Sequence, residues 1–257
     1  MNYNFTNKEE RAKVAQAHTE RMSSVYADKI QNTIDASLIY GPVPIKAKRK
    51  FDDKRLMNIQ VFATDSVSAS QMLCSDNSTT AVLNFASYKN PGGKFLNGSR
   101  AQEECLCHES YLYNVLKQFQ GYYDWNQSNL NKGLYLNRGI YSPKVLFRDE
   151  FEVDVITCAA PNFGVASKYQ NVSKEENREV LKSRIYFILD MATVNKVDNV
   201  VLGAFGCGVF KQDPYIVAEV FKECLNDYNC FKNIIFAIPE GHDEQNLIAF
   251  REVLCSK

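Results

Sequence analysis

Short apolar runs alternate with longer amphipathic stretches along most of this chain. Five runs have the length and the β-branched content of buried strands, and they cover residues 59–63, 81–86, 153–159, 199–204 and 234–238. The stretches between them carry apolar positions at helical spacing. Strands that alternate with helices predict an α/β fold in which helices cover a largely parallel or mixed sheet.

Polar residues that cap helix N-termini mark where several of the expected helices begin. They are Asp65 or Ser66 for a short helix, Ser173 with Glu176 for a long helix, and Asp213 before Pro214 for a third. A further helix is expected from about Gln102 to Leu116, with Cys105, Leu112 and Leu116 on one face. Residues 247–254 belong to a closing helix.

The first forty residues predict helix, and Thr6 with Glu9 has the spacing of a capping box. The apolar stripe of this helix is formed by Val14, His18, Met22 and Val25. We interpret His18 as a histidine packed at the edge of the core rather than a ligand. Residues 41–44 form a loop, so residues 1–45 are expected to be an N-terminal helical extension and residues 46–257 the main domain. Residues 117–150 are expected to be irregular, with a hairpin around 133–141.

Composition narrows the function classes without choosing one. Thirty basic and thirty acidic residues cancel, so bulk charge gives no argument for binding nucleic acid or a membrane. No apolar stretch approaches the roughly 18 residues of a membrane span, and the N-terminus lacks the order of a secretory signal. We therefore expect a cytoplasmic protein whose eight cysteines are reduced. The Cys105-Leu106-Cys107-His108 cluster has poor zinc geometry, because no second cysteine pair accompanies it.

Two glycine-containing loops follow predicted strands. Residues 91–94, Pro-Gly-Gly-Lys, leave one strand and residues 206–210, Gly-Cys-Gly-Val-Phe, leave another. Each loop alone could be a tight turn, but two such loops at the carboxyl ends of strands can present N–H groups to a diphosphate from both sides. A P-loop is excluded, because Tyr88 and Phe95 stand where that motif needs glycine and Ser or Thr.

Adjacent carboxylates follow the first glycine loop. Glu103 and Glu104 lie in the first turn of the expected helix, where acidic residues are favoured by the helix dipole alone. Consecutive helical residues point roughly 100° apart. These two carboxyl groups therefore cannot flank one bond as a glycosidase pair does. If one of them performs chemistry, the other must hold the substrate or orient its neighbour.

The glycine loop and the Gln102-Glu103-Glu104 run together resemble the signature of poly(ADP-ribose) glycohydrolases (PARGs), a triple glycine followed closely by Gln-Glu-Glu. Further segments similar to the short microbial branch of that family, in family order, are 83–87, 98–104, 140–143, 147–149, 160–162, 202–210 and 246–251. The resemblance covers nearly the whole chain. It implies a macrodomain-like mixed sheet sandwiched by helices, preceded by the N-terminal helical extension.

The resemblance also implies the residues of the site and their reaction. The implied substrate-binding positions are Asn90, Gly92, Gly93, Lys94, Gln102, Gly206, Cys207, Gly208, Val209 and Phe210. Glu104 matches the catalytic acid, with Glu103 beside it to hold the substrate. The expected reaction is hydrolysis of ribose–ribose O-glycosidic bonds in poly(ADP-ribose), possible without a metal or cofactor, on ADP-ribose polymers carried by modified proteins. The acid would need a raised pKa, which an occluded site beside a second carboxylate can provide.

Lys94 departs from the family pattern, because it replaces the third glycine. A left-handed backbone there would cost about 1 kcal/mol, and the ammonium group could pair with Glu104, lower its pKa and weaken proton donation. Alternatively, the side chain points to solvent. Phe205 and Gln212 are milder departures. Three other hypotheses therefore stay open: a module that binds ADP-ribose with little turnover, a hydrolase of another ADP-ribosyl bond, and an interaction domain without a nucleotide ligand.

Overall fold

The computed structural model describes residues 7–51, 56–75, 77–241 and 244–255, and within these ranges the strands form one seven-stranded sheet. The strands are β1 (Leu38–Tyr40), β2 (Asn58–Phe62), β3 (Thr80–Phe85), β4 (Gly139–Phe147), β5 (Phe151–Cys158), β6 (Asn199–Leu202) and β7 (Asn233–Ala237), in the spatial order β1-β4-β5-β3-β6-β7-β2. The five predicted strands are confirmed. The strands from β5 through β3, β6 and β7 to β2 pair in parallel. β4 pairs antiparallel with β5, and β1 pairs antiparallel with β4, so the sheet is mixed.

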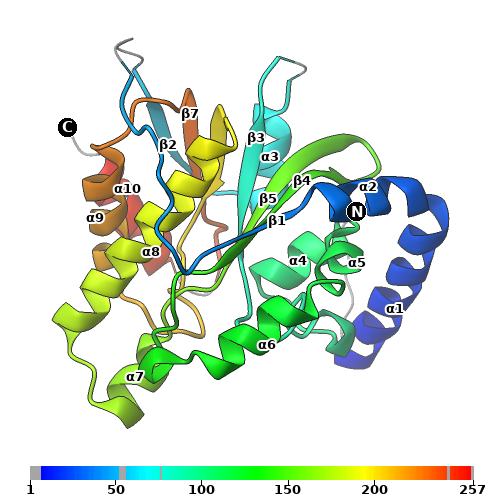
Figure 1. Ribbon diagram of the computed structural model, residues 1–257, viewed down its shortest axis with the longest axis horizontal. Coiled ribbons are helices and arrows are strands. Elements are labelled where there is room, and N and C mark those ends of the chain that lie inside the picture. Colours follow the sequence, from blue (N-terminus) through cyan, green and yellow to red (C-terminus); the bar gives the residue numbers. More distant parts are fainter. Residues whose placement is uncertain (1–6, 52–55, 76, 242–243, 256–257) are drawn as a thin grey trace.

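Helices cover both faces of the sheet (Figure 1). They are α1 (Lys8–Val25), α2 (Ala27–Ala36), α3 (Ser66–Leu73), α4 (Gln102–His108), α5 (Leu112–Leu116), α6 (Gln120–Ser128), α7 (Phe163–Gln170), α8 (Lys174–Val194), α9 (Pro214–Leu225) and α10 (Gln245–Cys255). Short 3-10 turns occur at η1 (Phe95–Asn97) and η2 (Asn131–Gly133). One core lies between the sheet and α8, α9 and α10, and a second lies between the sheet and α1 to α6. The predicted macrodomain-like sandwich is confirmed.

Local capping chemistry explains where the predicted helices begin. The side chains of Asp65, Ser173 and Asp213 each accept hydrogen bonds from N–H groups in the first turn of α3, α8 and α9. These bonds satisfy donors that have no partner inside the helix. Pro214 at the start of α9 fits because its missing N–H is not needed there.

The N-terminal segment differs from its prediction in three ways. Thr6 lies outside the described residues, and the side chain of Asn7 caps α1 by accepting from the N–H of Glu10 at 2.8 Å. The helix breaks at Tyr26, and Val25 is 57% exposed rather than part of the buried stripe. The last residues form strand β1, whose pairing with β4 fixes an extended conformation. The proposed boundary at residue 45 stays a prediction.

The expected helix over 102–116 is two helices, and this changes which face is buried. The chain turns between α4 and α5, where the N–H of Leu112 donates to Ser110 Oγ at 3.1 Å. The turn resets the helical phase, so Leu106 and Cys107 are buried while Cys105 is exposed. The prediction that Cys105 shares one helix face with Leu112 and Leu116 was therefore wrong, because Leu112 and Leu116 are buried and belong to α5.

Residues 117–150 are more regular than expected. They contain α6 and β4, and β4 pairs antiparallel with β5, which follows directly. The hairpin turn lies at residues 148–150, where Arg148 and Asp149 have φ angles of 51° and 59°. The predicted hairpin around 133–141 was therefore placed too early in the chain.

Three neighbouring parallel strands position the candidate site. β5, β3 and β6 lie side by side in the middle of the sheet and run in the same direction. Their carboxyl ends open at one edge into residues 86–101 after β3, 159–162 after β5 and 203–213 after β6. Ligands on sheets of this kind bind beyond the carboxyl ends of the strands.

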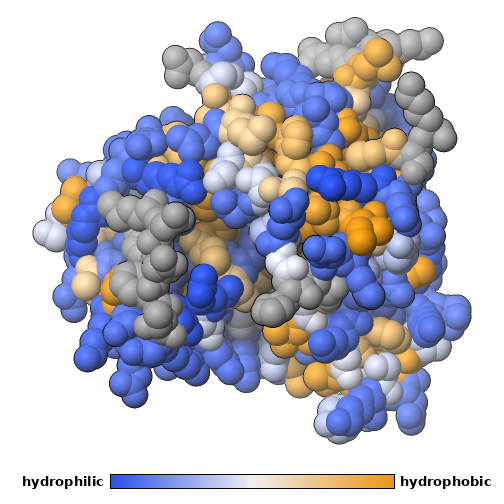
Figure 2. Space-filling view, turned by 180° about the vertical axis from the view of Figure 1, so that it is seen from behind, coloured by the Kyte–Doolittle hydropathy of each residue, from blue (hydrophilic) through white to orange (hydrophobic). Residues whose placement is uncertain are grey.

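The outer surface is mainly hydrophilic on the face seen from behind, with apolar residues in separate groups (Figure 2). Among the described helices, none combines the length and the apolar content needed to cross a membrane.

Candidate active site

The first glycine loop, residues 86–101, wraps around two carboxyl groups. Gly92 and Gly93 both have left-handed backbones, with φ angles of 64° and 62°. A Cβ atom on Gly93 would lie 2.5 Å from Glu104 Oε1 and 3.0 Å from Glu103 Oε2. A Cβ atom on Gly92 would lie 2.8 Å from the Tyr113 ring. Glycine is therefore required at both positions by backbone conformation and by space.

Lys94 does not take the strained conformation considered from the sequence. Its φ angle is −113°, which any residue can adopt, and its side chain is exposed. Its backbone N–H donates to Glu104 Oε1 at 2.9 Å. Among the ion pairs of the described residues, none joins the Lys94 ammonium group to Glu104. The side chain points to solvent, which was the alternative that leaves the acid unchanged.

Glu104 is buried, with 5% of its surface exposed. Its Oε1 accepts from Lys94, and its Oε2 accepts from the N–H of Ala101 at 2.8 Å, as in one half of a capping box at the start of α4. Each end of the loop segment 94–101 is thus tied to one oxygen of the same carboxyl group. The carboxyl group of Glu104 therefore holds the two ends of this segment together.

Glu103 lies beside Glu104 and is equally buried, with 3% of its surface exposed. Its Oε2 accepts from the N–H of Ser87 at 2.7 Å, and its Oε1 accepts from Asn84 Nδ2 at 3.3 Å. Burial raises the pKa of Glu103 to about 8; hydrogen bonds from Ser87, Asn84 and the Gly92 backbone oppose this rise, and the charge of Glu104 adds to it. Glu103 therefore has the raised pKa that an occluded site gives to a carboxyl group.

Gln102 binds the protein rather than open space. Its side-chain oxygen accepts from the N–H of Phe85 at 2.9 Å, and its amide nitrogen donates to the Leu83 carbonyl at 2.8 Å and to Ser66 Oγ at 3.1 Å. These bonds fasten the start of α4 to the end of β3 and so fix where Glu103 and Glu104 lie. Its predicted contact with the substrate stays a prediction.

The second glycine loop, residues 203–213, is built differently. Gly206 has a φ angle of 80°, and a Cβ atom there would lie 2.9 Å from both Ala160 Cβ and Gln212 Cγ. Nothing lies within 4 Å of a Cβ atom on Gly208, and Val209 is 82% exposed. Among the hydrogen bonds of the described residues, none uses the N–H groups of residues 208–210. These N–H groups are available to a ligand.

Two residues of this loop that depart from the family pattern, Gln212 and Phe205, pack beneath it. The side-chain amide of Gln212 pairs with that of Asn177 through bonds of 2.8 Å and 2.9 Å, and it also donates to the Pro161 carbonyl at 2.8 Å. Phe205 is buried and packs edge-on against Phe85, with 5.6 Å between ring centroids. Both departures from the family pattern are therefore packed and satisfied.

Aromatic residues connect the two glycine loops. Tyr88, at the start of the first loop, stacks on Tyr135, with 4.4 Å between ring centroids and 21° between planes. Tyr135 in turn lies 6.2 Å from the ring of Phe210 in the second loop. The sequence analysis missed Tyr88 and Tyr135 as site residues. The one sequence signal that could have identified them is that both are large aromatic residues in segments expected to be loops.

Asn90 stabilises the turn before the glycines. Its N–H donates to Ser87 Oγ at 3.2 Å, and its carbonyl accepts from the N–H of Gly93 at 3.0 Å. Contact between its side chain and a ribose stays a prediction.

The described residues include no group of three or more His, Cys, Asp or Glu side chains placed to hold a metal ion. His18 is packed at the core edge as expected, with Nε2 2.8 Å from the Ser110 carbonyl and its ring edge-on to Phe95.

Comparison with known proteins places these features in a family. The family model for the microbial-type PARG catalytic domain matches residues 8–149. The fold is similar to that of PARG from Thermomonospora curvata, with 28% sequence identity, a TM-score of 0.88, and coverage of 96% of this chain and 100% of that chain. No curated protein sequence gives a significant match.

Two further solved structures contain ligands. PARG from Deinococcus radiodurans in complex with ADP-ribose has 31% identity and a TM-score of 0.78, and covers 88% of this chain and 96% of that chain. The Thermomonospora curvata enzyme bound to the inhibitor ADP-HPD has 27% identity and a TM-score of 0.82, with coverage of 95% and 99%.

Proposed function

We propose that this chain, which belongs to the microbial-type PARG family, hydrolyses ribose–ribose O-glycosidic bonds in poly(ADP-ribose) and releases ADP-ribose. The observation that carries the proposal is the packing of Glu103 and Glu104 against Gly93 at the carboxyl end of β3. The solved PARG structures that contain ADP-ribose and ADP-HPD share this fold and add support.

The two glycine loops would divide the work of binding. The N–H groups of residues 208–210 have no partner among the described residues and can donate to the diphosphate of ADP-ribose. In the first loop, backbone N–H groups donate to the carboxyl groups of Glu103 and Glu104. The contribution of this loop is therefore to place the two acids beside the bond that breaks. Phe210 and Tyr88 then border the bound nucleotide from opposite loops.

Glu104 would act as general acid and then general base. It donates a proton to the leaving ribose oxygen as the glycosidic bond breaks, and the oxocarbenium character of the other ribose is stabilised by the nearby diphosphate. The same carboxylate then removes a proton from the attacking water. Glu103, held neutral near pH 7 by its raised pKa, adds no second negative charge beside the leaving group.

The experiment is ADP-ribose release from purified poly(ADP-ribose), measured for the wild type, Glu104→Gln and Glu103→Gln. We expect Glu104→Gln to reduce the rate by about 1,000-fold or more, while ADP-ribose binding measured by calorimetry is retained. A smaller loss is expected for Glu103→Gln, since an amide preserves the neutral form. If Glu103→Gln removed more activity than Glu104→Gln, the assignment of the acid would be wrong.

A second candidate function is binding of ADP-ribose with little turnover. It is favoured by one observation, that both oxygens of Glu104 accept backbone N–H groups within the loop. This candidate predicts tight ADP-ribose binding with no product and equal behaviour of the wild type and Glu104→Gln. A mono-ADP-ribosylated protein assayed in parallel distinguishes hydrolysis of another ADP-ribosyl bond. Absence of any thermal shift with ADP-ribose would contradict all of these functions.

A further inference from the structure

One buried arginine has no acidic partner among the residues that the structure describes. Arg184 on α8 is 1% exposed. Its Nε donates to Asn137 Oδ1 at 2.7 Å, its Nη1 donates to the Ala159 carbonyl, and its Nη2 donates to the carbonyls of Tyr135 at 3.1 Å and Leu134 at 3.4 Å. Among the ion pairs of the described residues, none involves this guanidinium group.

Burying a cation without a counter-ion is costly, unless hydrogen bonds replace the water that it loses. Arg184 meets this condition only through the backbone and Asn137 of the segment after η2 and through the end of β5. A guanidinium group offers five N–H donors in one plane, which suits several carbonyl groups that converge on it. The side chain therefore ties residues 134–137 to the residue that follows β5.

The residue held most directly by Arg184 is Tyr135. Tyr135 has a φ angle of 58°, an uncommon conformation for a large side chain. Its carbonyl accepts from Arg184 and from Asn131 Nδ2 at 3.3 Å, and its N–H donates to the Leu130 carbonyl at 3.0 Å. These bonds maintain a backbone that aims the ring between Tyr88 and Phe210.

We propose that Arg184 is a positioning residue for ADP-ribose binding: by fixing Tyr135 it sets the spacing between the first glycine loop, which places the carboxyl groups, and the second, which binds the diphosphate. This inference rests on the proposed function only in taking ADP-ribose as the ligand. Arg184 itself lies beneath the binding surface and touches no substrate. Its loss lets the Tyr135 ring leave the stack, so the second loop no longer faces the first at a fixed distance.

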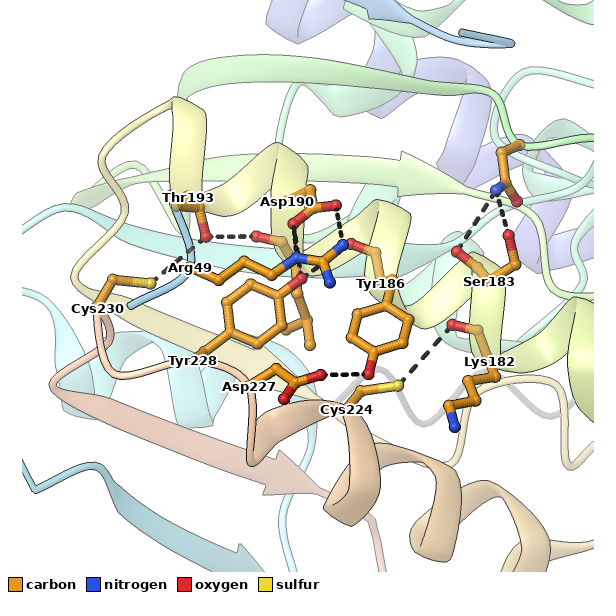
Figure 3. Close-up of polar contacts among 12 residues, drawn as sticks. Arg49, Lys182, Ser183, Tyr186, Asp190, Thr193, Cys224, Asp227, Tyr228 and Cys230 are labelled. Atoms are coloured by element: carbon orange, nitrogen blue, oxygen red, sulfur yellow. Dashed lines mark hydrogen bonds and ion pairs between the residues drawn. The ribbon is translucent and has the colours of Figure 1, made fainter. Parts of the chain in front are cut away.

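Arg49, a partly buried arginine that binds the same helix α8, provides a control. Arg49 pairs with the carboxylate of Asp190 on α8 through bonds of 2.8 Å and 2.7 Å. The ring of Tyr186 lies 4.3 Å and that of Tyr228 5.4 Å from its guanidinium carbon, and Figure 3 shows the two rings beside this ion pair. This cluster joins Arg49 to α8, and the contacts named here involve no residue of either glycine loop.

The test compares Arg184→Lys with Arg49→Lys in the full chain, using ADP-ribose as the probe in calorimetry. Both variants should melt at a lower temperature than the wild type. We expect the Kd for ADP-ribose to rise about tenfold in Arg184→Lys and to change less than about twofold in Arg49→Lys. For poly(ADP-ribose) hydrolysis, KM should rise while kcat stays within about threefold. Equal Kd values for the two variants would overturn the inference.

Tyr135→Leu keeps the test decisive if Arg184→Lys fails to fold. This variant retains the bonds of Arg184 and removes the stacked ring, so it should also weaken ADP-ribose binding about tenfold. Tyr135→Phe keeps the ring and should bind within about threefold of the wild type. An unchanged Kd in Tyr135→Leu would overturn the inference. If the wild type binds ADP-ribose without turnover, the proposed hydrolysis fails, yet the Kd values still decide the role of Arg184.

Discussion

The two glycine loops of this protein follow neighbouring parallel strands, yet their backbone N–H groups are used differently. In residues 86–101, the N–H groups of Ser87 and Lys94 donate to the buried carboxyl groups of Glu103 and Glu104. In residues 203–213, the N–H groups of 208–210 have no partner within the described part of the chain. The first loop holds acids in place, and the second leaves its donors for an anion. Similar glycine patterns therefore serve different chemistry.

This difference also separates glycines that are required from those that are not. Gly93 and Gly206 have left-handed backbones and closely approaching neighbours, whereas Gly208 has open space around its Cα atom. A graded series of substitutions can therefore test the division of work between the loops.

The largest effect is expected for Gly93→Ala. The new methyl group would lie 2.5 Å from Glu104 Oε1 at a φ angle of 62°, so the loop or the carboxyl group must move. We expect poly(ADP-ribose) hydrolysis to fall at least about 100-fold and the free energy of unfolding to fall by about 2–3 kcal/mol. Urea denaturation and ADP-ribose release measure the two effects.

Gly121→Ala is the control for this variant. Gly121 lies in α6, and nothing is within 4 Å of a Cβ atom there. Activity should be unchanged, and alanine should add about 0.5–1 kcal/mol to the free energy of unfolding. Normal turnover in Gly93→Ala would contradict the tight packing of the first loop.

Gly206→Ala should mainly affect binding. Its methyl group would lie 2.9 Å from Ala160 Cβ and Gln212 Cγ, so the second loop must shift relative to the end of β5. We expect the Kd for ADP-ribose to rise about tenfold, with a loss of about 1–2 kcal/mol in stability. Gly208→Ala should leave the free energy of unfolding within about 0.5 kcal/mol of the wild type. Equal destabilisation by the two substitutions would show that the loop is not built as described.

The pH dependence of stability tests the environment of Glu103. Its pKa rises from 4.5 to about 8 on burial, so between these values the folded protein keeps a proton that the unfolded chain releases. The free energy of unfolding should therefore fall as pH increases from about 4.5 to about 8, and level off above that range. Glu103→Gln should remove this component, which appears as the difference between the two pH profiles. Parallel profiles would place the raised pKa elsewhere.

Local signals in the sequence were sufficient for much of the fold. The caps at Asp65, Ser173 and Asp213 act within one helical turn, and the apolar runs of the central strands are buried on both sides. The glycine pattern and the adjacent glutamates likewise identified the segment that carries the candidate site. These features depend on residues close together in the chain, so the sequence displays them directly.

Features set by distant residues could not be predicted. β1 has three residues and becomes a strand through pairing with β4, about a hundred residues later. The left-handed backbone of Tyr135 depends on a guanidinium group from α8. The raised pKa of Glu103 comes from its burial, and this burial depends on the packing of α4 against β3, which the sequence does not display.

Lys94→Gly should have the smallest effect on activity, and it sharpens the comparison most directly. The contact of residue 94 with Glu104 is made by the backbone N–H, which glycine retains, and the φ angle of −113° does not require glycine. We expect kcat/KM for poly(ADP-ribose) to change less than about threefold, with a stability loss of about 0.5–1 kcal/mol from added chain entropy. A tenfold or larger rise in turnover would mean that the lysine side chain restrains Glu104. Lys94, in place of the third glycine, would then limit the activity of the site.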